Sequence, residues 1–344
     1  MVLDNADNYN SIAEWIPKEG GAVLVTTRDP APGALCAKQI IAVPLLGLEE
    51  AVTWLYQLSE RKPESLSGQE QAAAKNLVKK LGYLPLAIAQ AAAYLRVQTG
   101  VSIEDYCSRF TELLADPTLA NQEGEEKNAD RYSRHVVAST WTLSLQAIDA
   151  SAKARHLVSL SYPLIGSCVF FASKNIPVSL LENFLKKFHL VNSNLVNYVV
   201  DEYIGQLVRY SLIERSNIDN VLSIHQLVQK VIREQLDFYG QHIDYLLKSH
   251  QVLSDIYPYV KDRVVDLGLK RQLLPHLLSF LTYLDLMVEK IHSTKACEDK
   301  KVKKKLEEWL RGYKGEVLVP VLNYLADACS AVGDAHQENA QLVR

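Results

Sequence analysis

The sequence predicts a mainly α-helical protein that opens with a remnant of a parallel α/β sheet. Two apolar runs near the amino terminus have the composition of buried strands, and from about residue 45 the apolar residues follow the helical period. At about 150 residues per domain, a chain of 344 residues is too long for a single hydrophobic core. We therefore expect five consecutive parts: the α/β remnant (1–44), a helical subdomain (45–115), a linker (116–134), a winged-helix subdomain (135–236) and a helical, repeat-like region (237–344).

The composition is that of an ordinary globular protein, with 48% hydrophobic and 22% charged residues. The net charge of −3 gives no global positive field that would attract a nucleic acid or an anionic membrane. The five cysteines form no Cys-x-x-Cys pair, which disfavours a disulfide framework or a zinc site. No apolar run reaches about 18 residues, and Asp4 and Asp7 stand where a signal peptide would carry positive charge. The sequence therefore predicts a cytoplasmic protein with no membrane contact and favours no nucleic-acid partner.

The first 44 residues are predicted to form strand, helix and strand. Residues 1–4 are a short apolar run that ends on an acid, and residues 22–27 form a second run that is rich in β-branched residues. Between them, Ser11 to Ile16 can form only a short helix because Pro17 follows. This order is typical of a doubly wound sheet with parallel strands.

The helical subdomain is predicted from apolar stripes and from helix start and stop signals. The signals are the stripe Leu48, Val52, Leu55 and Leu58; the capping box Ser67-x-x-Glu70; Gly82 after the second helix; Pro85 in the first turn of the third; and Ser102-x-x-Asp105 before a fourth helix that ends near Leu114.

Two tryptophans also lie on helical stripes, Trp54 in this subdomain and Trp141 further along the chain. Both are expected in the core.

A polar, aperiodic stretch from Asp116 to Asp130 predicts the linker. Three or four helices and then a β-hairpin are expected after it, which is the plan of a winged helix. The helices are expected over 136–148, 152–162, 178–188 and 197–208, and the two strands over Ser211–Arg215 and Val221–Ile224, joined by the turn-prone Ser216–Asn220.

Only helices are expected from about Leu236 to the end of the chain. The last two, about 317–332 and 335–343, resemble one helix-turn-helix repeat, whereas a solenoid needs at least about three. The repeat array is therefore expected to be absent or cut off. The lysine run over 300–305 precedes Glu307 and Glu308, which favours a solvated helix face over a targeting or nucleic-acid patch.

Four segments carry candidate ligand-binding chemistry. Asp4 ends the first strand, where a carboxylate can hold Mg²⁺ because a hard cation needs oxygen ligands. Arg28 ends the neighbouring strand, at the edge where open sheets bind ligands, and its guanidinium can read a terminal phosphate. The ring of Pro85 forms an apolar surface on which the flat base of a nucleotide can lie. His225 lies where a strand meets a helix and can donate a hydrogen bond to a phosphate oxygen.

Each of the four residues also has a structural interpretation. Taken alone, these interpretations match or outweigh the functional ones, and only the order of the four segments along the chain favours ligand binding. The structural roles are a strand-terminal turn at Asp4, a surface cation beside Asp29 at Arg28, a helix start at Pro85 and a satisfied structural imidazole at His225.

In this order, the four segments resemble the Walker B strand, the sensor-1 arginine, the Gly-x-x-Pro motif and the histidine motif of the winged-helix domain in NB-ARC proteins, which belong to the STAND class of NTPases. The most specific stretch, Leu207 to Leu236, looks like the winged-helix end of NB-ARC proteins that carry tetratricopeptide repeats. Ala138–Leu145 and Leu274–Leu277 are also similar to that subgroup. The resemblance covers nearly the whole chain.

The resemblance implies a site for ADP or ATP with Mg²⁺. By its motifs, Asp4 takes the position of the Mg²⁺ acid and Arg28 that of the γ-phosphate sensor. Pro85 takes the position of the proline that stacks on adenine, and His225 that of the histidine that contacts the β-phosphate of ADP.

Two departures from the family pattern limit the chemistry. Asn5 stands where many members have a second acid that acts as a base, which leaves Asp7 as a nearby candidate. None of the fifteen glycines precedes a lysine, so the Walker A loop that cradles the β- and γ-phosphates is missing. We therefore expect no ATP hydrolysis and no strong nucleotide binding by this chain alone.

The leading hypothesis is a truncated STAND-type signalling switch whose family couples ADP/ATP exchange to conformational change and oligomerisation. Protein partners are expected to bind the helical, repeat-like region, and the open strand edges at 1–4 and 22–27 favour self-association or a partner chain. An alternative is a helical interaction scaffold that does not depend on nucleotide. A third hypothesis is DNA binding by the winged helix, for which only Lys186 and Lys187 lie on the helix 178–188.

Overall fold

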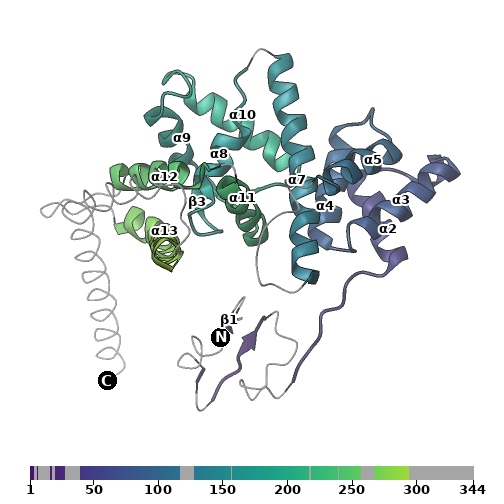
Figure 1. The fold of residues 1–344 in the computed structure, drawn as a ribbon, viewed down its shortest axis with the longest axis horizontal. Coiled ribbons are helices and arrows are strands. Elements are labelled where there is room, and N and C mark those ends of the chain that lie inside the picture. The colour runs from purple at the N-terminus through teal and green to yellow at the C-terminus, as the bar shows by residue number, and fades with distance from the viewer. Residues whose placement is uncertain are drawn as a thin grey trace, which may run out of the picture. The chain divides into compact units, whose positions relative to one another are not determined.

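The computed structural model describes residues 1–3, 6, 16–17, 20–27, 39–116, 128–155, 157–216, 218–238, 240–256 and 267–293. These residues contain eleven α-helices, a two-stranded parallel sheet and a three-stranded antiparallel sheet (Figure 1). The chain divides into two compact units, Met1–Leu46 and Gly47–Arg344, and each is described by itself. The prediction of a mainly helical protein that contains a small parallel sheet is confirmed.

The amino-terminal unit contains the parallel strand pair. β1 (Val2–Leu3) lies beside β2 (Leu24–Val25), and the Leu24 amide donates a hydrogen bond to the Met1 carbonyl oxygen. The parallel strands expected at 1–4 and 22–27 are therefore present, although each is short. Their prediction as buried strands is wrong within this unit, since Val2 is 66% and Leu24 60% exposed. The helix expected over Ser11–Ile16 lies, apart from Ile16, outside the described residues.

The second unit begins with a block of helices that matches the predicted starts and stops. Ser67 and Ser102 each cap a helix, because their hydroxyls accept hydrogen bonds from the Glu70 amide (3.1 Å) and the Asp105 amide (2.9 Å). The Glu70 carboxylate accepts from the Ile103 amide (2.9 Å), so it joins the starts of two helices. The elements are α2 (Leu48–Ser59), the 3₁₀ turn η3 (Pro63–Ser65), α3 (Gly68–Lys80), α4 (Pro85–Val97) and α5 (Ile103–Leu114).

A tight turn joins α3 to α4. Gly82 and Tyr83 both have left-handed backbone conformations, with φ of 63° and 56°, and Gly82 ends α3 as predicted. Tyr132 of the next helix covers this turn: its hydroxyl donates to the Lys80 carbonyl oxygen (2.7 Å) and its ring lies 3.3 Å from where a Cβ at Gly82 would be. The turn that precedes Pro85 is therefore held from outside the α3–α4 hairpin.

A single helix, α7 (Asn128–Ala154), replaces the shorter helix expected over 136–148 and includes residues 128–134, which were assigned to the linker. Contacts with residues far away in the sequence explain why the helix begins earlier than predicted. Tyr132 caps the α3–α4 turn, and the Arg134 side chain, only 8% exposed, lies 3.6 Å from Glu234. Contacts made by polar residues therefore stabilise a segment that has no apolar stripe.

The next seven elements form a helical module with a small sheet. The strands pair in the order β3-β5-β4, both pairs antiparallel. β3 was not predicted, because two residues are too few to show an alternating pattern, and the helix expected over 152–162 is absent, since α7 ends at Ala154. The elements are α8 (Ser161–Cys168), β3 (Ile176–Pro177), α9 (Val178–Lys187), α10 (Val196–Arg209), β4 (Glu214–Ser216), β5 (Val221–Ser223) and α11 (Gln226–Phe238).

Two further helices follow, α12 (His242–Ile256) and α13 (Leu267–Ser293). The last helices expected, over 317–332 and 335–343, and the lysine run over 300–305 lie outside the described residues. Within the described parts of the chain, no helix combines the length and the apolar character needed to cross a bilayer.

The core confirms one of the two tryptophan predictions. Trp141 on α7 is 1% exposed and is among the largest fully buried side chains. Trp54 is 39% exposed, so its prediction as a core residue is wrong. The buried face of α2 is formed instead by Ala51, Val52, Leu55 and Tyr56, and Trp54 lies beside this face rather than on it.

Two helical glycines predict opposite effects of the same substitution. At Gly166 on α8, an added Cβ would lie 2.6 Å from the Tyr245 ring of α12, whereas at Gly205 on α10 nothing lies within 4 Å. We expect Gly166→Ala to lower the free energy of unfolding by about 1–3 kcal/mol through overpacking. Gly205→Ala should raise it by about 0.5–1 kcal/mol through helix propensity. Urea unfolding of both variants measures this, and equal effects would contradict the α8–α12 contact.

Candidate functional site

His225 occupies the junction between β5 and α11. Its carbonyl oxygen accepts the first helical hydrogen bond, from the Gln229 amide (3.1 Å), and its Nδ1 accepts from the Leu227 amide (3.1 Å). The side chain therefore caps the amino terminus of α11, where free amide groups and the helix dipole favour an anion.

This cap fixes the tautomer of the imidazole. A nitrogen that accepts a hydrogen bond carries no proton, so the proton of neutral His225 lies on Nε2. Desolvation by its surroundings lowers the pKa of His225, and the Glu214 carboxylate offsets this only in part. The residue is exposed. At neutral pH it therefore presents an Nε2–H donor beside a helix amino terminus.

Polar side chains hold α11 in place against the end of α8. The last carbonyl groups of a helix have no partner within it. The buried Gln229 amide donates to the carbonyl oxygens of Cys168 and Phe171 (both 3.2 Å), and Arg233 donates to that of Val169. With His225, these two residues form a polar series at positions i, i+4 and i+8 of α11, a signal that was readable in the sequence but was not used.

Pro85 is the first residue of α4 and is exposed to solvent. The predicted helix start is confirmed, because a proline in the first turn lacks only an amide that has no helical partner there. The preceding Leu84 is half-buried and adds apolar surface beside the ring.

The long helix α7 packs against both α4 and α11, so that it links the helices on which Pro85 and His225 lie. On the α4 side, the buried Thr140 hydroxyl donates to the Gln90 side-chain oxygen (2.7 Å). On the α11 side, Arg134 pairs with Glu234. Burial raises the pKa of Glu234 despite this cation.

The other predicted site residues, Asp4, Asp7 and Arg28, lie outside the described residues, as does Asn5. Among the described residues, no group of three or more His, Cys, Asp or Glu side chains has the arrangement of a metal site.

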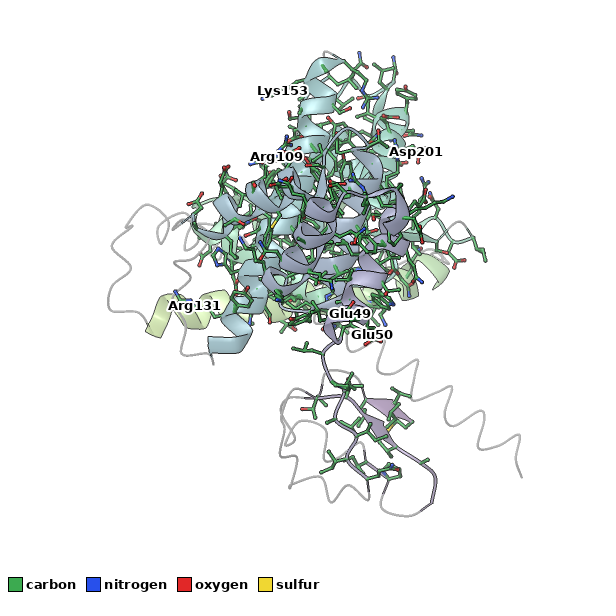
Figure 2. All side chains as sticks on the ribbon, turned by 90° about the vertical axis from the view of Figure 1, so that its right-hand side faces the viewer. Glu49, Glu50, Arg109, Arg131, Lys153 and Asp201 are labelled. Atoms are coloured by element: carbon green, nitrogen blue, oxygen red, sulfur yellow. The ribbon has the colours of Figure 1, made fainter. Side chains whose placement is uncertain are left out.

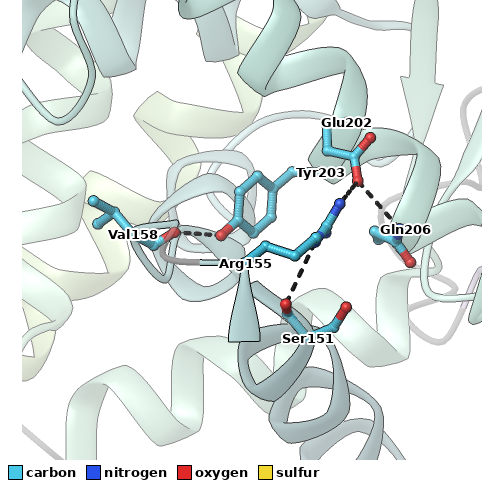
Figure 3. Close-up of polar contacts among 6 residues, drawn as sticks. All are labelled: Ser151, Arg155, Val158, Glu202, Tyr203 and Gln206. Carbon is cyan, nitrogen blue, oxygen red and sulfur yellow. Dashed lines mark hydrogen bonds and ion pairs between the residues drawn. The ribbon is translucent and has the colours of Figure 1, made fainter. Parts of the chain in front are cut away.

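The surface of α10 mixes both signs of charge. Asp201 pairs with Arg215 of β4 (2.9 Å), and Glu202 pairs with Arg155 just after α7 (2.7 Å), whose guanidinium also donates to the Ser151 carbonyl oxygen (Figure 3). The hydrogen bond from Arg155 lowers the pKa of Glu202, because it outweighs the desolvation of the Glu202 carboxylate. Figure 2 labels Lys153, in the last turn of α7, and Asp201 of α10, which are exposed charges of opposite sign. This helix therefore offers no continuous basic surface to a nucleic acid.

On the helix 178–188 that carries Lys186 and Lys187, the Lys187 ammonium is engaged by the Asp255 carboxylate of α12. One of the two cations on which the DNA-binding hypothesis depended is thus used within the protein. The structure gives that hypothesis no added support.

Comparison with known proteins gives two similarities. Residues 152–239 match the model of a family described as a domain of unknown function (DUF7779), a span that contains α8 to α11 with both hairpin strands and β3. A nucleotide-binding leucine-rich repeat (NLR)-like protein from the fungus Hyaloscypha variabilis is 28% identical over 287 residues. The match covers 82% of this chain and 27% of the relative, so the chain spans about a quarter of that protein's length. The chain is distantly related to NLR-like proteins.

Proposed function

We propose that this chain supplies the helical and winged-helix parts of a nucleotide-dependent signalling switch of the NB-ARC type. Two observations support the assignment. The distant relative is described as nucleotide-binding and NLR-like. The order α8, β3, α9, α10, β4, β5 with strands paired β3-β5-β4 is the topology of a winged helix.

The observation that carries the proposal is the arrangement of His225. Because Nδ1 caps α11, the Nε2–H group is left to donate to a ligand at the same helix terminus that favours an anion. We propose that it donates to a phosphate oxygen of ADP, with the adenine on the apolar surface of Pro85 and Leu84. When bound, ADP would supply the link between the two helices that α7 already connects.

The proposed binding is regulatory rather than hydrolytic. The sequence contains no Gly-Lys pair and therefore no Walker A loop to hold the β- and γ-phosphates. Asp4 and Asp7 remain predictions for the Mg²⁺ site, and Arg28 remains the predicted γ-phosphate sensor. We therefore expect no steady ATP turnover by this chain. Oligomerisation, protein partners of the helical region and a cytoplasmic location belong to the same proposal.

The test is a calorimetric titration of the purified chain with ADP. We expect weak, saturable binding that His225→Ala weakens at least about tenfold, since a hydrogen bond to a charged group is worth about 1.5–3 kcal/mol. His225→Asp separates the two roles of the residue, because aspartate is a strong helix cap but has no N–H group to donate. It should keep the stability of α11 and lose the affinity.

The matched control is His189→Ala, which removes an exposed histidine that lies after α9 and should leave the affinity unchanged. Binding that survives both substitutions at His225 would contradict the proposed site. If the unaltered protein gives no heat of binding with ADP, the result would favour the alternative function.

The alternative is a nucleotide-independent interaction scaffold, and exposed apolar side chains favour it. Leu195 and Tyr198 at the start of α10 are 53% and 71% exposed, and Ile218 in the turn between β4 and β5 is 93% exposed. Large apolar side chains that stay in water are typical of contact surfaces when they occur together. A scaffold needs no nucleotide to present them.

A further inference from the structure

The last two described helices contact each other and the segment that follows α8 through the rings of three histidines, which we call the histidine seam. His242 and His250 lie on α12 and His276 lies on α13, and each imidazole packs against a phenylalanine. The pairs are His242–Phe170 (5.1 Å between ring centroids), His250–Phe280 (5.3 Å) and His276–Phe171 (5.9 Å).

His276 lies in the middle of the buried face of α13. This face is otherwise apolar, and His276 itself is 0% exposed. Pro275, which precedes it within the helix, is exposed. The apolar members of the face are Leu273, Leu277, Phe280 and Leu284.

The hydrogen bonding of His276 leaves no place for a second proton. Its Nε2 lies 2.9 Å from the carbonyl oxygen of Asn175, between α8 and β3, so this nitrogen donates. Its Nδ1 is buried and has no partner among the described residues. A proton on Nδ1 would create a buried cation with an unpaired N–H group, which is costly.

The charged groups near the seam do not compensate such a cation at His276. Burial lowers the pKa of His276, and the group that raises it is the neutral Asn175 carbonyl. On α11, Arg233 stacks over the ring of Tyr283 on α13 (4.1 Å), which places a cation, not an anion, on that side. Glu234, also on α11, is engaged by Arg134.

The other two histidines have carboxylates nearby. Asp237, in the last turn of α11, lies 3.6 Å from Nδ1 of His242. Asp255 raises the pKa of His250, but burial dominates and lowers it to about 4. Asp255 is also paired with Lys187 of α9. Acid therefore acts on the seam mainly through His250 and His276.

We propose that the histidine seam is a proton-sensitive contact, which holds α13 against the α8–β3 segment at neutral pH and releases it on acidification. Once α13 leaves, the His276 ring meets water and can take a proton at its ordinary affinity. Protonation therefore favours the released state. The contact is suited to release because the described side chains that hold α13 are spaced along one face, and among them there is no strand ladder and no ion pair.

The expected size follows from the difference in proton affinity between the held and released states. A histidine exposed to water has a pKa of about 6.5. If one histidine stays neutral while buried, the equilibrium constant for release of α13 is about tenfold larger at pH 5.5 than at neutral pH. Release that exposes both His250 and His276 would increase it about a hundredfold. The opening should involve only α12 and α13, so these helices should exchange faster than the rest of the unit.

The test is hydrogen exchange of the full chain followed by mass spectrometry at pH 7.5 and 5.5, with rates corrected for the intrinsic pH dependence of exchange. We expect peptides from α13 to lose about ten- to a hundredfold of their protection at pH 5.5, and at both pH values to stay less protected than peptides from α4, which exchange only when the whole unit unfolds. His276→Gln retains a donor for Asn175 but cannot be protonated, so it should reduce the loss about tenfold. His189→Gln, an exposed histidine, should behave as the unaltered protein.

Three results would overturn the proposal. Protection of α13 that does not change with pH would show that no histidine there controls its attachment. An equal loss in His276→Gln and in the unaltered protein would assign the effect to other groups. Protection of α13 equal to that of α4 at both pH values would show that α13 opens only when the whole unit unfolds, and if His276→Gln fails to fold, His250→Gln tests the same contact from α12.

Discussion

Trp141→Ala is expected to lower the free energy of unfolding by about 3–5 kcal/mol, the largest effect of any single substitution considered for this chain. The indole is 1% exposed and lies on α7, which packs against α4, α5, α8 and α11. Its removal leaves a cavity between helices that cannot close without shifting α7. Urea unfolding followed by circular dichroism measures the loss without relying on tryptophan fluorescence.

The matched control is Trp54→Ala, which changes the same residue type on α2. Trp54 is 39% exposed and lies beside the buried face, so the substitution should cost well under half as much as that at Trp141. Similar losses at the two positions would contradict the packing described for α2 and α7.

Acid is expected to destabilise the protein through His250. Its pKa is about 4 in the folded state, chiefly because of burial, and about 6.5 in the unfolded chain. Above pH 6.5 both states are neutral and the residue has no effect. As the pH falls below 6.5, His250 takes up a proton in the unfolded chain but stays neutral in the folded protein. The free energy of unfolding therefore decreases until the pH reaches about 4.

At pH 5 this difference amounts to about 2 kcal/mol relative to pH 7.5. Urea unfolding at the two pH values should show at least this loss, and His250→Gln should reduce it by about that amount. An unchanged pH dependence in His250→Gln would show that the residue is not held neutral in the folded protein.

Local signals in the sequence predicted the helical block well. Ser67 and Ser102 form side-chain caps, Gly82 adopts a left-handed backbone, and Pro85 is the first residue of α4. Each depends on chemistry within a few residues of the chain, which explains why sequence alone sufficed. The parallel pairing of the first two strands was also predicted, from the order of strand, helix and strand.

The features that were missed depend on residues far apart in the chain. The first turns of α7 are polar and read as a linker, yet Tyr132 and Arg134 find partners at Lys80 and Glu234. β3 has only two residues and exists because it pairs with β5. No pattern within a short window shows such partners.

The candidate site was predicted only in part. His225 and Pro85 both lie at the first turns of exposed helix ends, as their positions in the sequence indicated. The tautomer of His225 was not predictable, because it depends on the Leu227 amide in the finished helix. Gln229 and Arg233, which fix α11 by binding the carbonyl groups at the end of α8, were also missed.

The most direct test of the central claim is to find where bound adenine lies, by photolabelling the chain with 8-azido-ADP and mapping the modified peptide by mass spectrometry. We expect a label within residues 81–97, around Pro85, that excess ADP removes and that His225→Asp weakens in proportion to the lost affinity. A competable label on a peptide remote from both Pro85 and His225, or none at saturating nucleotide, would contradict it.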